Sequence, residues 1–208
     1  MTEISRESSP LSLSSALSLY QVLLEKWQRK INLVSPDTLN DLEGRHFRDS
    51  LQLAALIPDG TKTLLDLGSG AGFPGMVLAL ARPEIDVYLL DSDEKKCEFL
   101  RTISRETRRP VNVLCQRIES PLSLIPDVIT ARALAPLPKI LDYVRPFFHV
   151  NQNLILILPK GKNWQAEVDE ASKSFGFYLE HFPSETSEEA QILRLSHVHV
   201  LDDSRETL

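Results

Sequence analysis

The chain has 208 residues, of which 42% are hydrophobic, and a formal net charge of −6. This length and apolar content suffice for one α/β domain with a small addition, and the acidic balance excludes a protein coated uniformly in basic charge. Its two cysteines show no metal-type spacing, and the chain begins without a signal-peptide pattern. These features predict reduced thiols in a cytoplasmic protein. Prolines interrupt every apolar run before the ~20 residues that a bilayer span needs, so we expect no membrane association.

The first 59 residues read as a helical extension. Residues 2–9 are polar and rich in serine, which is typical of a loose tail, and apolar residues then recur at spacings of three and four. Helical patterns begin near Leu11, at Pro36 with Asp37, and after Gly44, and the last one ends before Pro58-Asp59-Gly60. We therefore predict that residues 1–59 form an extension packed on a main domain of residues 60–208.

After residue 60, strand and helix patterns alternate, which indicates a doubly wound, mostly parallel sheet with right-handed crossovers. Strands are expected at 63–66, 85–90, 111–115, 128–131 and 154–158, with helices at 75–81, 93–107, 136–148 and 163–175. The end departs from this rhythm, because residues 176–181 and 192–200 flank a polar loop and read as a hairpin. An antiparallel pair closing a parallel sheet is a known variation of this fold.

A glycine-rich segment links the first expected strand to its helix. It runs from Asp66 to Gly75 as Asp-Leu-Gly-Ser-Gly-Ala-Gly-Phe-Pro-Gly. Glycines allow a ligand to approach the backbone, and a helix start offers free N–H groups with partial positive charge. The segment therefore predicts a nucleotide cradle; a tight turn without a ligand is the alternative, although such a turn needs only one or two glycines.

Two cofactors fit this cradle. Residues 70–75 match the dinucleotide fingerprint G-x-G-x-x-G, and Asp91 follows about twenty residues later, so NAD is a candidate. S-adenosylmethionine is favoured because Gly68 already closes the strand, two residues before that fingerprint begins. Asp66, expected at the strand tip, suits a ligand with an ammonium group and a sulfonium but would repel a pyrophosphate. The antiparallel ending also resembles the class I methyltransferase fold.

Asp91 ends the second expected strand and is a candidate ligand of the ribose hydroxyls in either interpretation. The alternative role is to cap the next helix, since Asp93-Glu94 follows it. We favour cofactor binding.

With its flanking segments, the chain resembles the small-subunit ribosomal RNA methyltransferase G family, also called glucose-inhibited division protein B. The matching segments are Trp27 with Asn32-Leu33-Val34-Ser35, Arg45-His46-Phe47-Arg48-Asp49-Ser50-Leu51, Asp66 to Gly75, Leu90-Asp91-Ser92 with Lys95-Lys96 and Phe99-Leu100, Thr130-Ala131-Arg132-Ala133, and Leu158-Pro159-Lys160-Gly161. Gln28 departs from the pattern, because the family usually has asparagine after the tryptophan.

The resemblance implies methyl transfer from S-adenosylmethionine to the N7 of one guanine in 16S ribosomal RNA, free or in the small subunit, in the bacterial cytoplasm. The implied enzyme is a class I methyltransferase that acts as a monomer without a metal. Carried over by position, the cofactor contacts are Gly68, Phe73, Asp91, Ile118, Glu119 and Arg132, and the glycine-rich cradle adds Asp66 and Gly70. An NAD-dependent oxidoreductase and a non-catalytic ribosome-assembly factor are the competing hypotheses.

Guanine N7 carries a free lone pair, so its methylation needs no general base, and the protein must mainly position the base. Arg132 and Lys160 are the candidate catalytic residues, at the ends of the fourth and fifth expected strands. A structural Arg132 paired with Asp127 or Asp142 is the alternative. The candidate RNA contacts are Asn32, Arg45, His46 and Arg48. Other basic residues gather in the 95–109 segment, as either a local basic face or a solvated helix surface.

Overall fold

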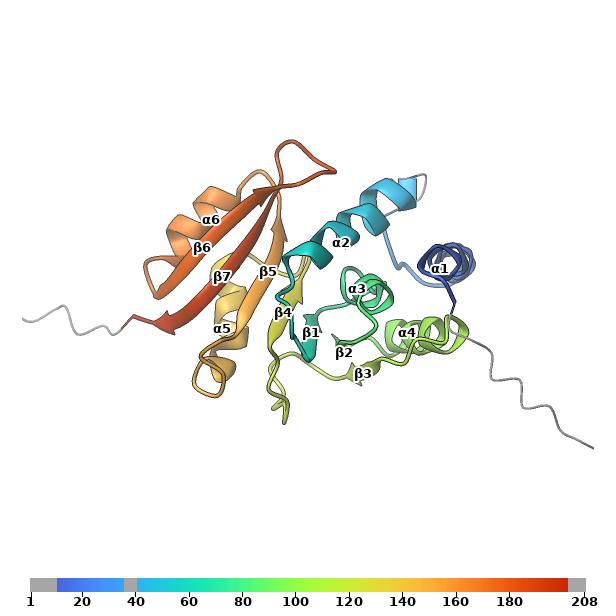
Figure 1. Cartoon of the computed structure of the whole chain (residues 1–208), viewed down its shortest axis with the longest axis horizontal. Coiled ribbons are helices and arrows are strands. Elements are labelled where there is room, and N and C mark those ends of the chain that lie inside the picture. Colours follow the sequence, from blue (N-terminus) through green and yellow to red (C-terminus); the bar gives the residue numbers. More distant parts are fainter. Residues whose placement is uncertain (1–10, 36–40, 202–208) are drawn as a thin grey trace, which may run out of the picture.

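The structure, a computed structural model, describes residues 11–35 and 41–201. The expected tail at 2–9 and the helix start at Pro36 lie outside these residues. The strands are β1 (Thr63–Leu67), β2 (Asp86–Asp91), β3 (Asn112–Cys115), β4 (Val128–Ala131), β5 (Ile155–Lys160), β6 (Phe175–Pro183) and β7 (Gln191–Val200). They form one sheet in the order β3-β2-β1-β4-β5-β7-β6 (Figure 1).

The first five strands are parallel, and β7 runs antiparallel to both β5 and β6. This confirms the predicted fold class, a mostly parallel sheet with an antiparallel C-terminal strand. The helix expected at 163–175 is shorter than predicted, because α6 spans Trp164–Ala171 and Phe175 already begins β6. None of the described helices is long and apolar enough to cross a membrane.

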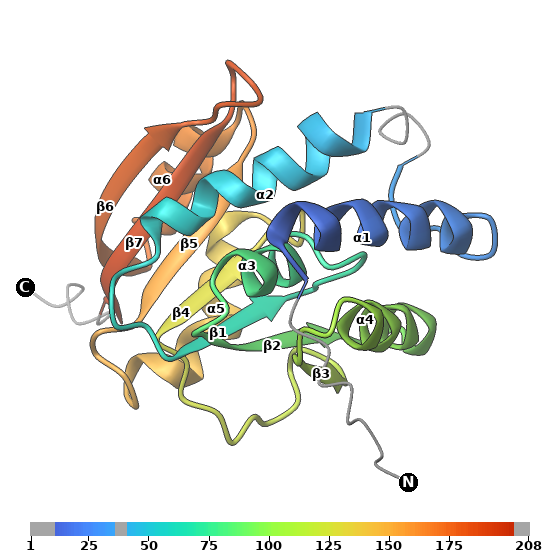
Figure 2. The same ribbon diagram turned by 45° about the vertical axis from the view of Figure 1, so that its right-hand side comes forward.

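Helices cover both faces of the sheet (Figure 2). One face carries α1 (Leu13–Gln28), α3 (Gly75–Ala81) and α4 (Glu94–Glu106), and the other carries α5 (Leu137–Phe148) and α6. Successive strand residues point to opposite faces, so Leu64 packs in the first core and Leu65 in the second. The same alternation points Asp66 toward α3, which decides its role.

The N-terminal segment shares the first core. A continuous helical stretch consists of η2 (Glu43–Arg48), α2 (Asp49–Leu51) and η3 (Gln52–Leu56). Tyr20 of α1 and Phe47 of η2 are buried, and their rings lie 5.3 Å apart between centroids. Gln28, the departure from the family pattern, accepts hydrogen bonds from the N–H groups of Leu33 and Val34. The division at residue 59 stays a prediction.

The tip of the C-terminal hairpin contacts this helical stretch. Thr186 donates a hydrogen bond to Asp49 Oδ1 at 2.8 Å, and the Glu185 N–H donates to the Gln52 side chain at 2.8 Å. Segments more than 130 residues apart in sequence therefore meet at Asp49. This contact joins the helical stretch before β1 to the loop between β6 and β7.

Candidate functional site

The loop between β1 and α3 adopts backbone conformations that favour glycine. Gly68 has a φ of +65°, and a β-carbon there would lie 2.7 Å from Leu134 Cδ1. Gly72 has a φ of +92°, and a β-carbon there would collide with the Tyr20 hydroxyl. That hydroxyl donates a hydrogen bond to the Ala71 carbonyl. Helix α1 therefore holds the glycine loop from behind.

Asp66 is not the last residue of its strand, because β1 continues to Leu67. Its carboxylate points toward the start of α3. The side chain is fully buried, accepting from Thr130 Oγ1 at 2.7 Å and from the Gly75 N–H at 3.2 Å. Burial raises the pKa of this carboxyl to about 6. In this structure Asp66 fastens the loop to β4 and α3 and is not exposed to a ligand, unlike the contact implied for it.

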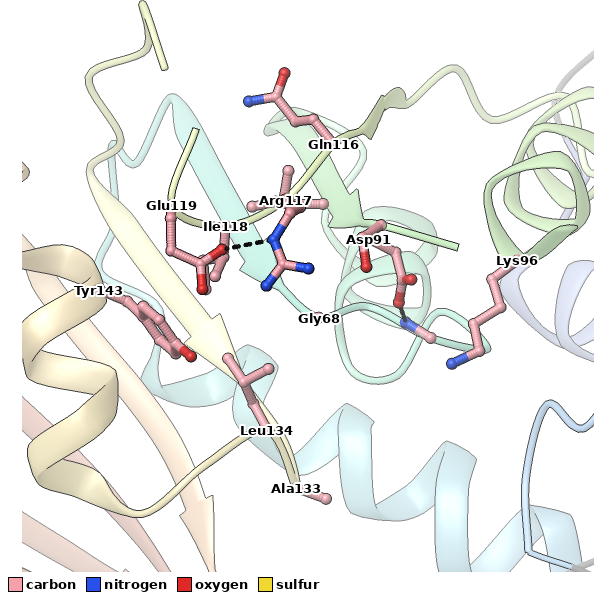
Figure 3. Close-up of a pocket in the computed structure, with 13 residues that line it drawn as sticks. Gly68, Asp91, Lys96, Gln116, Arg117, Ile118, Glu119, Ala133, Leu134 and Tyr143 are labelled. Carbon is pink, nitrogen blue, oxygen red and sulfur yellow. Dashed lines mark hydrogen bonds and ion pairs between the residues drawn. The ribbon is translucent and has the colours of Figure 1, made fainter. Parts of the chain in front are cut away.

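A cavity of roughly 380 Å³ opens in front of the loop, at the carboxyl ends of β1, β2 and β4 (Figure 3). Asp91 lies on its wall with Oδ2 accepting from the Gly70 N–H at 2.8 Å and Oδ1 accepting from the Asp93 N–H at 2.9 Å. The cap of α4 is Asp93, which accepts from the N–H groups of Lys95 and Lys96. The alternative in which Asp91 caps this helix is therefore wrong.

Five of the residues proposed to contact the cofactor line this cavity: Gly68, Gly70, Asp91, Ile118 and Glu119. Asp66 and Phe73 are not among its lining residues, and Arg132 lines a different cavity. Lys96, Gln116 and Tyr143 also line this cavity and were not predicted as site residues (Figure 3); the rest of the wall consists of Leu90, Ser92, Arg117, Ala133 and Leu134. Only Lys96 carried a signal, since it lies one turn after Asp91 at the start of α4.

Arg132 follows β4 and is held by several groups. Its Nη1 lies 3.0 Å from Asp49 Oδ2, its Nη2 lies 2.8 Å from His46 Nδ1, and its guanidinium carbon lies 5.0 Å from the Phe73 ring centre. The prediction that a structural Arg132 would pair with Asp127 or Asp142 is wrong. Asp127 accepts from two backbone N–H groups at the start of β1, and Asp142 pairs with Arg145.

Phe73 and His46 form the support beneath Arg132. The Phe73 ring is buried between Tyr20, with centroids 5.6 Å apart, and His46, at 4.8 Å. Burial and the nearby Arg132 charge lower the pKa of His46 to about 4. His46 is therefore neutral near pH 7, and its Nδ1 can accept the hydrogen bond from the guanidinium. Both residues position Arg132 in this structure, whereas Phe73 was expected to contact the cofactor and His46 was a candidate RNA contact.

A second cavity, of roughly 580 Å³, lies beside the first and shares Ala133 and Leu134 with it. Its charged lining residues are Arg45, Asp49, Arg132, Lys160 and Glu167. The two candidate catalytic residues therefore meet here, as their places at the ends of neighbouring strands predicted.

Lys160 is nearly buried and already has partners. Its Nζ donates to the Ala135 carbonyl at 2.8 Å and lies 2.7 Å from Glu167 Oε2.

Of the candidate RNA contacts, only Arg45 lines the second cavity. Arg48 faces a separate cavity between α1 and η2, and Asn32 is exposed but lines neither of the first two cavities. Within the described residues, no three metal-binding side chains come together.

The family model for rRNA small subunit methyltransferase G matches residues 13–193, nearly the whole described chain. The chain belongs to this family. A relative named ribosomal RNA small subunit methyltransferase G, from Paramagnetospirillum magneticum, is 45% identical over 182 residues, covering 88% of this chain and 87% of that protein. Its counterpart from Gluconobacter oxydans is 43% identical, covering 94% and 97%.

Solved structures give the same fold. The magnesium protoporphyrin IX methyltransferase from Synechocystis, with bound SAM, aligns with a TM-score of 0.59 at 16% identity, covering 94% of this chain and 100% of that one. The ribosomal protein L11 methylase from Lactobacillus delbrueckii aligns with a TM-score of 0.57 at 15% identity, covering 73% and 77%. Membership in the methyltransferase G family thus favours the methyltransferase hypothesis over the oxidoreductase and the assembly factor.

Proposed function

We propose that this chain methylates the N7 of a guanine in 16S ribosomal RNA with S-adenosylmethionine as the donor. The observation that carries the proposal is the pair of adjoining cavities, one beside Asp91 and the other beside Arg132 and Lys160. Because Ala133 and Leu134 line both, a cofactor in the first and a base in the second would meet at this wall. The names of the family and of its relatives supply the RNA as substrate.

The first cavity fits the proposed cofactor. Its volume falls within the ~300–1,000 Å³ typical of ligand pockets. The Asp91 oxygens keep acceptor capacity for ribose hydroxyls beyond the two N–H groups they bind. Ile118 and Glu119 would present backbone to the adenine, and Gly68 allows close approach to the chain. When bound, S-adenosylmethionine supplies a methyl group activated by its sulfonium.

The residues of the second cavity suit a reaction that needs no base. Guanine N7 attacks with its own lone pair, so the protein gains rate by fixing the direction of approach. Arg132 is preorganised for this task by Asp49, His46 and Phe73, and it can donate to the guanine O6 next to N7. We further propose that the enzyme works as a monomer in the cytoplasm, where the small subunit is assembled.

Transfer of labelled methyl groups to small subunits from cells lacking this modification tests the proposal. We expect label in the RNA, and mass spectrometry of its digest should identify N7-methylguanine at one position. The Arg132→Ala variant should reduce transfer by at least 100-fold, whereas Arg145→Ala, an exposed arginine on α5, should transfer normally.

Unlabelled RNA at saturating cofactor would refute the proposal. Binding of S-adenosylhomocysteine without any transfer would support the assembly factor. A change in NADH fluorescence with no response to S-adenosylhomocysteine would support the oxidoreductase.

A further inference from the structure

Glu167 presents one oriented oxygen to the second cavity. Its Oε2 accepts from the Leu137 N–H at 2.7 Å and lies 2.7 Å from Lys160 Nζ. Lys160 is anchored in turn by the Ala135 carbonyl. Among the described residues, Oε1 has no hydrogen-bond partner, and the side chain, 24% exposed, lines the cavity. The carboxylate is therefore fixed through Oε2, and Oε1 remains as an acceptor on a side chain that lines the cavity.

The other charges of the cavity show what kind of group this acceptor would meet. Arg132 is paired with Asp49 and Lys160 with Glu167, so carboxylates balance two of the three cations that line the cavity, and the third, Arg45, is exposed. A phosphate would meet these carboxylates as well as the cations, whereas a neutral base with hydrogen-bond donors would not be repelled. The part of the cavity beside these two pairs is thus better suited to a base edge than to the RNA backbone.

We propose that Glu167 reads the Watson–Crick edge of the target guanine, accepting hydrogen bonds from N1–H and the 2-amino group. This inference rests on the proposed function. N7 lies on the opposite side of the purine from these donors, so the reacting atom stays free while the base is held. Adenine has no proton on N1 and no 2-amino group, so its N1 lone pair would face the carboxylate and be repelled.

The same contact assists the reaction. The N7 lone pair forms the new bond to the methyl carbon, the sulfur keeps the electron pair of the broken bond, and no proton leaves. The base becomes a cation, and its N1–H becomes a stronger donor. The bond to the Glu167 carboxylate therefore strengthens toward the transition state, which raises kcat as well as affinity. Lys160 acts as a positioning residue for Glu167.

The test uses two RNAs, ligated from synthetic fragments, that differ only at the target position. One carries guanine and the other inosine, which lacks only the 2-amino group. Wild-type protein should methylate the guanine RNA about 10- to 100-fold faster than the inosine RNA, as expected for a hydrogen bond to a charged acceptor. In Glu167→Gln, the amide oxygen can still accept from the Leu137 N–H, which leaves an NH₂ group toward the base. This variant should show less than threefold discrimination and a lower kcat.

Glu170→Gln is the matched control, because Glu170 lies on the same helix, α6, as Glu167. It is exposed and pairs with Lys173. It should keep wild-type discrimination. Binding of both RNAs without cofactor gives a second readout, in which wild-type protein should favour guanine and Glu167→Gln should not. Undiminished discrimination by a folded Glu167→Gln would overturn the inference. If wild-type protein methylates neither RNA, the proposed function fails, and the binding comparison still decides the role of Glu167.

Discussion

Replacing Asp66 with asparagine separates a structural carboxylate from a cofactor ligand. Burial raises its pKa from 3.8 to about 6 in the folded protein. Between these values the folded state holds a proton that the unfolded chain has released, so the free energy of unfolding falls as pH rises. This loss of unfolding free energy is nearly complete at pH 7 and amounts to ~3 kcal/mol in total. Asparagine does not titrate and can still accept from the Gly75 N–H while donating to the Thr130 hydroxyl.

We therefore expect the stability of Asp66→Asn relative to wild type to rise by ~2.4 kcal/mol between pH 4 and pH 7. Urea unfolding at a series of pH values measures this difference, and the titration of His46 cancels because both proteins contain it. Affinity for S-adenosylhomocysteine at pH 7 should change by less than threefold. A stability difference that does not vary with pH would refute the buried, raised-pKa carboxyl. A 100-fold loss of cofactor affinity in a folded variant would restore Asp66 as a direct ligand.

Three further changes probe the supports of the two cavities. Tyr20→Phe removes the hydroxyl that holds the glycine loop, and calorimetry should show about 3- to 10-fold weaker cofactor binding with the helical circular dichroism unchanged. Gly68→Ala forces a positive φ on alanine and brings its methyl group toward Leu134, so thermal unfolding should show a loss of ~1–3 kcal/mol together with weaker cofactor binding. Thr186→Val removes a hydrogen bond to the carboxylate that holds Arg132, and single-turnover kinetics should show about 3- to 10-fold slower methyl transfer at unchanged cofactor affinity.

The order of strands and helices could be predicted because apolar periodicity is a local property of the chain. Strand β4 was predicted at its observed limits, and the antiparallel hairpin followed from the alternating pattern of its second strand. The hydrogen-bond and ion-pair partners of individual charged side chains could not be predicted in this way. Arg109 was grouped with a basic cluster, yet it donates to the carbonyls of Ala79 in α3 and of Ile85 just before β2, and so ties the segment after α4 to both. Such partners come from other parts of the chain.

The site shows the same distinction. The cavity wall around Asp91 was predicted because it follows a strand end, a position that parallel sheets reserve for ligands. Asp66 was expected at the strand tip, but β1 extends one residue further, and the side chain binds Thr130 and the Gly75 N–H, which lie elsewhere in the sequence. Glu167 and Thr186 belong to no local motif. Their roles depend on contacts with Lys160 and Asp49, which only the folded chain brings together.

The cluster Arg45-His46-Arg48 illustrates why a basic motif need not form one RNA-binding face. These residues lie within one six-residue π-helix, whose turns direct neighbours to different sides. His46 points inward to Arg132, Arg45 faces the second cavity, and Arg48 faces α1. Because Arg132 is already paired with a carboxylate, exposed Arg45 is the better candidate for a phosphate at the rim. The base would then enter the cavity beneath Arg45. Attraction of the RNA backbone and selection of the base are thus assigned to different side chains, the first on η2 and the second on other residues that line this cavity.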